Sequence, residues 1–129
     1  MRSKLVRIRI RKIKRLLLKK EESGGAFDST LTKKDFLFNE KVREVYEALG
    51  PFNAPPTRDS STLVDKEAYR LRNGSKYWGQ WSQNLKTRTG LGMFVWLDGS
   101  LYEGQWRNGR SHGVGRLIHA NGDTYQGEW

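Results

Sequence analysis

The strongest constraint on this chain is a pentapeptide, Tyr-x-Gly-x-Trp, that occurs three times in its second half. The three copies begin at residues 77, 102 and 125. A glycine also stands three residues before each of these tyrosines, at Gly74, Gly99 and Gly122. Self-similarity at a nearly constant period indicates an architecture in which each unit is one supersecondary motif. The repeat therefore limits residues 66–129 to an array of small, similar units.

Tight turns are expected between the units, because Asn or Asp precedes each of these glycines. Asn-Gly and Asp-Gly pairs favour type I′ turns, in which both central residues have positive φ. Each unit is therefore predicted to be a β-hairpin, and the fold class to be mainly β, with antiparallel stacked hairpins in one elongated sheet. The predicted strands cover about 68–72, 75–81, 91–97, 100–106, 115–119 and 124–129.

Each pentapeptide places its tyrosine, glycine and tryptophan on one face of a strand, since side chains alternate with a period of two. The central glycine leaves space for the neighbouring strand, and Gly113 and Gly115 are expected to lie beneath the rings. The rings are interpreted mainly as core packing between hairpins, and contact with a partner is the alternative that the pattern leaves open. The candidate partner-binding residues of this face are Tyr77, Trp81, Tyr102, Trp106, Tyr125 and Trp129.

This pattern resembles the membrane occupation and recognition nexus (MORN) repeat, which reads Tyr-x-Gly-x-Trp, then spaced glycines, then a turn glycine before the next tyrosine. Residues 102–124 match it throughout, and residues 125–129 supply the opening of a further unit. Residues 77–101 match with a longer loop around Asn84 and Leu85. The resemblance implies a slightly twisted run of hairpins used as an interaction surface. It also implies a scaffold role, because similar proteins are commonly components of cilia, flagella or the cell cortex, and others are linked to phosphoinositide membranes.

The net charge of +10 comes from one short segment. Residues 1–20 contain ten basic side chains and no acidic one, so the rest of the chain is neutral. We therefore divide the chain into a basic amphipathic arm (1–22), a linker region (23–65) and the repeat region (66–129). The apolar residues of the arm fit both a strand period and a helical stripe, and this choice stays open. The basic residues are Arg2, Lys4, Arg7, Arg9, Arg11, Lys12, Lys14, Arg15, Lys19 and Lys20.

A dense cationic segment indicates an acidic counter-surface, and its attraction is expected to depend strongly on salt. The candidate partners are protein subunits of a larger assembly, such as tubulin, or an anionic lipid surface. Nucleic acid is disfavoured as a partner, because the neutral repeat region offers no extended basic face. An acid-free, Arg-rich start also fits a mitochondrial targeting segment, which stays as an alternative.

One helix is predicted in the linker region, over about residues 33–49. Thr32 followed by Asp35 is a variant of the capping box, and Gly50-Pro51 supplies a stop. Helical spacing predicts an amphipathic helix, whose apolar face needs another element to cover it. The residues of that face are Phe38, Val42, Val45, Tyr46 and Leu49.

The sequence contains no constellation for catalysis or metal binding. It has no Cys and only two His residues, which excludes thiolate nucleophiles, disulfides and zinc sites built from several histidines. Ser111 and His112 are adjacent but lack an orienting group, and Glu103 and Glu128 are interpreted as solvent-facing strand residues. No apolar run in the sequence approaches the length of a membrane span. We therefore expect no enzyme activity, no cofactor and no metal.

These observations predict a non-catalytic scaffold subunit of a large cytoskeletal assembly, with the ciliary axoneme as the expected location. The hairpins dock a partner and the arm anchors the chain to an acidic surface. The alternatives are a peripheral membrane protein whose arm binds anionic phospholipid, and a subunit of an organellar complex. Because two and a half repeats are few, we expect the array to be continued by further repeats or covered by another subunit.

Overall fold

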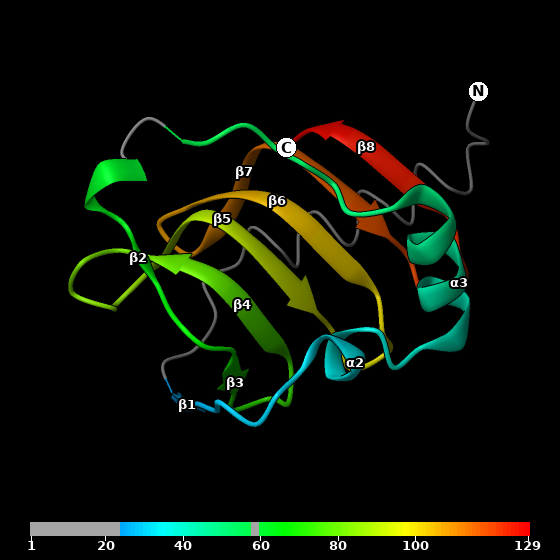
Figure 1. Cartoon of the computed structure of the whole chain (residues 1–129), viewed down its shortest axis with the longest axis horizontal. Helices are drawn as coiled ribbons and strands as arrows, with labels where there is room; N and C mark the ends of the chain where they lie inside the picture. The colour runs from blue at the N-terminus through cyan, green and yellow to red at the C-terminus, as the bar shows by residue number, and fades with distance from the viewer. Residues whose placement is uncertain (1–23, 58–59) are drawn as a thin grey trace.

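The computed structural model describes residues 24–57 and 60–129, so the predicted arm (1–22) lies outside the described residues. The chain forms one open antiparallel sheet in the order β1-β3-β4-β5-β6-β7-β8, with β2 also paired to β4 (Figure 1). The predicted fold class, mainly β with antiparallel hairpins in one sheet, is confirmed. The strands are β1 (Gly25–Phe27), β2 (Val64–Asp65), β3 (Tyr69–Leu71), β4 (Lys76–Trp81), β5 (Arg88–Val95), β6 (Leu101–Arg107), β7 (Arg110–Ile118) and β8 (Thr124–Glu128).

All the strands predicted for the repeat region are present. β5 and β7 begin earlier than predicted, because pairing continues on both sides of Gly90 and Gly113. β1 and β2 are not predicted by the pattern. Each has three residues or fewer and is held by pairing with β3 or β4. Such short segments contain too few alternating residues to produce a periodic signal.

The turns after β3, β5 and β7 differ from the predicted type I′ geometry. Asn73, Asp98 and Asn121 have negative φ, whereas the glycine after each has φ of 93°, 88° and 94°. In the first turn the glycine N–H donates to Leu71 O at 3.0 Å, and Leu71 N–H donates to Ser75 O at 2.8 Å. This is a three-residue hairpin loop, in which a type I turn is followed by a left-handed glycine.

Asn or Asp precedes each of these turn glycines because of the hydrogen bond that its side chain makes, and not because of a positive φ. Asn73 Oδ1 accepts a hydrogen bond from Ser75 N–H at 2.9 Å, and Asp98 and Asn121 accept equivalent bonds at the same distance. These side chains therefore stabilise the loops locally. A type I′ turn occurs instead between β6 and β7, where Asn108 has φ of 51° and the glycine after it 82°.

The helix predicted over about 33–49 is in fact two helices, α2 (Lys33–Phe36) and α3 (Glu40–Leu49). The predicted capping box at the start is confirmed, because Asp35 Oδ2 accepts a hydrogen bond from Thr32 N–H at 2.7 Å. A short 3-10 helix, η1, covers Ser60–Thr62. The helical prediction is correct in place but wrong in continuity.

The break between the two helices is caused by Asn39, which begins α3. Its Oδ1 accepts a hydrogen bond from Val42 N–H at 3.1 Å, and its Nδ2 donates to Asp98 O at 2.9 Å in the turn after β5. Phe38 therefore lies outside the helix and is 47% exposed, which corrects its assignment to the apolar face. α3 ends at Gly50, as the stop signal predicts.

The sheet has two chemically different faces, because adjacent residues of a strand point to opposite sides. We call the side that carries Tyr102 the ring face, and the side that carries Glu103 the strap face. The helices cover one end of the strands on the strap face, where they form a shared core. The buried residues of this core are Leu31, Phe36, Leu37, Val42, Tyr46, Ala68, Val95, Leu101 and Ile118.

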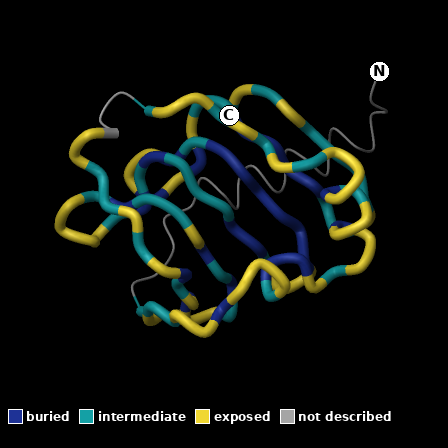
Figure 2. The backbone as a smooth tube through the Cα atoms, in the orientation of Figure 1, coloured by how far each residue is buried: buried dark blue, intermediate teal, exposed yellow. Residues whose placement is uncertain are grey.

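Residues 50–57, which we call the strap, continue from α3 across the same face of the sheet (Figure 1). Figure 2 shows that burial is deepest along the central strands, whereas the strap and the outer sides of the helices are largely accessible. No helix within the described ranges is long and apolar enough to cross a membrane.

Candidate interaction site

The inner aromatic residues of the repeat are buried in the ring face. Tyr77 and Tyr102 have no exposed surface, and Trp81 and Trp106 are at most 5% exposed. They belong to one hydrophobic cluster together with side chains from β3, β5 and β7. The interpretation of these four rings as core packing is therefore confirmed, and they offer no surface to a partner in this structure.

The six rings of the repeat form one continuous ladder along the ring face. Neighbouring ring centroids lie 5.1–5.4 Å apart, and the ring planes meet at 82–88°. This edge-to-face geometry is favoured by the charge distribution of aromatic rings. Tyr125 and Trp129 end the ladder half-buried, so the accessible part of the predicted site lies on this pair. In order, the ladder is Trp81, Tyr77, Trp106, Tyr102, Trp129 and Tyr125.

A row of glycines crosses the sheet beneath the ladder. A Cβ atom on Gly92 would meet the ring of Tyr77, and one on Gly115 would meet the ring of Tyr102. The missing side chains therefore let the tyrosines lie against the backbone, and the expectation of a small residue under the ring is confirmed for Gly115. The glycines paired in register from β4 to β8 are Gly79, Gly92, Gly104, Gly115 and Gly127.

Each tyrosine of the ladder also bonds to its own strand. The hydroxyls of Tyr77, Tyr102 and Tyr125 donate to the backbone carbonyl three residues on, at 2.6, 2.8 and 3.1 Å. Burial raises the pKa of the Tyr77 and Tyr102 hydroxyls above its ordinary value, so both stay protonated donors at neutral pH. The ladder is thus held by polar as well as apolar contacts in every unit.

Arg88 is a buried basic side chain among these rings, and the sequence pattern does not predict it. Its Nη2 donates to Gly109 O at 2.8 Å, and its guanidinium lies 5.2 Å from the Trp106 ring centroid and 5.8 Å from that of Tyr77. Contact with the faces of several rings stabilises a cation. In the next unit Ser111 stands in the place of Arg88. Arg88 therefore ties β5 to the turn after β6.

Glu103 is buried on the strap face, which corrects its interpretation as a solvent-facing residue. It is 6% exposed, and its carboxylate accepts a hydrogen bond from Arg116 Nη2 at 2.8 Å. Burial raises the pKa of Glu103, and the hydrogen bond from Arg116 opposes that shift. A departure from the repeat marks this site in the sequence, because Trp78 and Gln126 occupy the same position in the other units. Glu128 is exposed, as expected.

The Glu103–Arg116 pair holds the beginning of the strap through backbone groups. Arg116 Nη2 also donates to Gly50 O at 2.6 Å, and Glu103 Oε2 accepts from Phe52 N–H at 3.3 Å. The Arg116 guanidinium lies 5.6 Å from the Phe52 ring centroid. The two charges therefore compensate each other and bind the chain segment that crosses them.

Gln105 makes the next contact along the strap, and it also belongs to the repeat. Its Nε2 donates to Pro55 O at 2.8 Å, while its Oε1 accepts from Val114 N–H at 2.9 Å. Gln80 makes the equivalent acceptor bond at 2.8 Å in the preceding unit. The placement of Gly113 beneath the rings is wrong, because the space left by this glycine is occupied by the side chain of Gln105.

An open hollow of about 300 Å³ lies on the sheet beside the middle of the strap. Residues 52–54 form its outer wall. Its sheet side is mainly apolar, with Glu103 as a charged neighbour. The apolar residues are Trp78, Leu91 and Met93, and Trp78 is 40% exposed.

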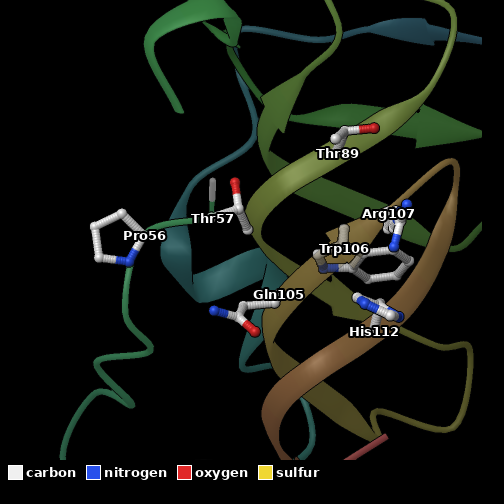
Figure 3. A pocket seen from close by; sticks show the side chains of 7 residues that line it. All are labelled: Pro56, Thr57, Thr89, Gln105, Trp106, Arg107 and His112. Carbon is white, nitrogen blue, oxygen red and sulfur yellow. The ribbon is translucent and has the colours of Figure 1, made fainter. Parts of the chain in front are cut away.

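A second hollow of about 690 Å³ lies at the end of the strap. Figure 3 shows Pro56 and Thr57 on one side of it and Arg107 and His112 on the other. This wall is polar and basic, and both Arg107 and His112 are exposed. Ser111 is buried although its neighbour His112 is exposed, so the adjacent pair lies in two different environments.

Within residues 24–57 and 60–129, no group of three or more His, Asp or Glu side chains is placed to hold a metal ion. The ten basic residues between Arg2 and Lys20 lie outside the described residues, so their anchoring role stays a prediction. The described part of the predicted site is therefore the ring ladder, and the strap face carries a second set of contacts that the repeat period does not indicate.

A family model of the MORN repeat matches residues 102–124. The match covers β6, β7 and the turn that leads to β8, and this segment is therefore a MORN repeat. MORN repeats generally mediate interactions with proteins or with membrane lipids and are generally non-catalytic. β4 and β5 pair through the same glycine register and the same tyrosine bond, so residues 77–101 have the geometry of the matched unit.

Proposed function

We propose that this chain is a non-catalytic scaffold subunit of a larger cytoskeletal assembly. The observation that carries the proposal is the geometry repeated from β4 to β8, in which each unit presents the same ring, glycine and hydroxyl contacts. Such an array gives a rigid support for the side chains that stay accessible at its surface. The matched MORN repeat supports a role in binding proteins or membrane lipids.

Docking is assigned to the end of the ring ladder. Tyr125 and Trp129 retain accessible surface, whereas the four inner rings build the support beneath them. Half-exposed aromatic side chains on a rigid element are frequent anchors of protein interfaces. A double variant, Tyr125→Ala with Trp129→Ala, should lose its co-purifying protein partner. Unchanged recovery of that partner would place docking elsewhere.

Anchoring is assigned to the basic residues of the arm, and the acidic surface of tubulin in an axoneme is the proposed counterpart. Ten cations in residues 1–20 give an attraction that salt weakens. The test is co-sedimentation with microtubules, using the full chain and a variant in which those ten residues are changed to Gln. The full chain should pellet at low salt and be released at high salt, whereas the variant should stay in the supernatant. Equal pelleting of both proteins contradicts this anchoring.

The second candidate is a peripheral membrane protein, which the lipid-binding role of MORN repeats favours. In this case the same cations bind anionic headgroups. Flotation with vesicles that contain phosphoinositide separates the two functions, because the membrane protein floats with them and does not pellet with microtubules.

A further inference from the structure

The strap is held by hydrogen bonds to its backbone and by the Phe52 ring beside Arg116. The side chains of Arg116, Glu103 and Gln105 bond to a carbonyl, an N–H and a second carbonyl of the strap, at 2.6, 3.3 and 2.8 Å. The strap itself lies outside any helix or strand and contains three prolines, which favour an extended conformation. The strap face is therefore constructed to bind an extended segment of polypeptide.

The strap leaves part of this face open to solvent. Two open depressions, of about 300 and 690 Å³, lie beside the strap before and after its Gln105 contact. Ala54 lines the first hollow and Thr57 the second, and both are small.

The chemistry of the two hollows differs. Trp78, Leu91 and Met93 line the first, which fits an apolar side chain larger than that of Ala54. Arg107 and His112 line the second, which fits an acidic side chain. A segment with these two features, and with the same backbone contacts, would occupy the face more completely than the strap does.

We propose that the strap face is a binding site for an extended, proline-containing segment of a partner protein, and that the strap is its intramolecular competitor. The partner segment carries a larger apolar residue in the place of Ala54 and an acidic residue in the place of Thr57. A second copy of this chain is a poorer occupant, because its own strap has the same two small residues. This site lies on the strap face, although Trp106 of the ladder also lines its second hollow, and it goes beyond the scaffold function proposed above.

The first test measures competition between the strap and a peptide probe. The probe is a fluorescent peptide, Gly-Pro-Phe-Asn-Leu-Pro-Pro-Asp, which is the strap sequence with a larger apolar residue and an acid at the two proposed places. Fluorescence polarisation is recorded with the full chain and with its Phe52→Ser variant, which removes the ring beside Arg116. The variant should bind the probe about tenfold more tightly, because a larger fraction of its binding face is open.

The second test assigns the binding to the strap face. In the Phe52→Ser background, Gln105→Glu removes the donor to Pro55 O and keeps an acceptor for Val114 N–H. It should weaken probe binding about tenfold. Gln80→Glu is the matched control, because it makes the same change in the preceding unit and should leave the affinity unchanged.

Two further measurements complete the test. The unmodified strap peptide should bind more weakly than the probe, and equal affinity would overturn the proposed partner chemistry. In the wild-type chain, saturating probe should increase hydrogen exchange at the Phe52 N–H, because the strap is displaced. This second readout does not depend on the folding of any variant.

Three results would overturn the proposal. The first is that the probe binds neither protein and the hydrogen exchange of Phe52 N–H does not change. The second is that Gln80→Glu and Gln105→Glu weaken probe binding equally. The third is that the unliganded chain sediments with a doubled molecular mass and that Phe52→Ser restores the single mass. The last result would show that two copies exchange their straps.

Discussion

The two faces of the sheet are built on opposite principles. On the ring face the tyrosine and glycine contacts recur from unit to unit, and Arg88 is the exception. Tyr102 bonds and packs as Tyr77 does, and Gly115 lies under its ring as Gly92 does. On the strap face the decisive contact occurs once in the described chain, at the Glu103–Arg116 pair.

This difference indicates that the two faces have different roles. Repeated contacts between neighbours give an array its stability, because each unit packs on the next. A residue that departs from the repeat cannot serve that purpose in every unit, so it indicates a local task. In this chain the local task is to hold the strap.

The largest effect is expected on the ring face, for Tyr102→Ala. Removal of this fully buried ring should lower the free energy of unfolding by about 4 kcal/mol, because it leaves a cavity beside two tryptophans. Tyr125→Ala is the matched control at the same repeat position, and its half-buried ring should cost about 1.5 kcal/mol. Urea unfolding measures both values. Equal costs would show that the ring face is not graded along the array.

A smaller effect is expected on the strap face, for Glu103→Ala. The change leaves Arg116 buried without its carboxylate and should cost about 3 kcal/mol of unfolding free energy. The double variant Glu103→Leu with Arg116→Met should cost less than about 1 kcal/mol, since apolar residues replace both charges. Its strap should nevertheless exchange its Phe52 N–H faster in hydrogen-exchange measurements. A double variant as unstable as the single one would assign the pair to the stability of the sheet.

The smallest effect is expected in the glycine row, where the missing side chains make room for the rings. Gly115→Ala should cost about 2 kcal/mol, because its Cβ meets the buried ring of Tyr102. Gly109→Ala is the control in the turn after β6, where the space is open and the positive φ alone should cost about 1 kcal/mol. Urea unfolding gives the costs, and near-ultraviolet circular dichroism reports the ring packing. A perturbed aromatic signal in both variants would argue against the specific role of Gly115.

Most of the ring face could be predicted from the sequence, because its signals are local and recur. The hairpins follow from turn residues at fixed offsets, and the burial of Tyr102 follows from the strand face that it shares with Gly104 and Trp106. The turn type was harder to predict from the sequence, since Asn73 favours a turn either through its backbone or through its side chain. The sequence did not predict the helix break at Asn39. The Asn39 side chain also bonds to the carbonyl of Asp98, which is distant in the chain and becomes a neighbour only in the folded protein.

The strap face shows where such prediction ends. The amino-acid sequence alone determines that residues 66–129 form antiparallel hairpins, since periodicity and turn chemistry act between near neighbours. It contains no periodic signal for the contacts of Gly50 with Arg116 or of Pro55 with Gln105, which join residues far apart in the chain. Those contacts, the burial of Glu103 and the hollows beside the strap exist only because the folded sheet brings distant residues together. The contacts of the strap face therefore depend on tertiary structure, whereas local sequence already determines the hairpins of residues 66–129.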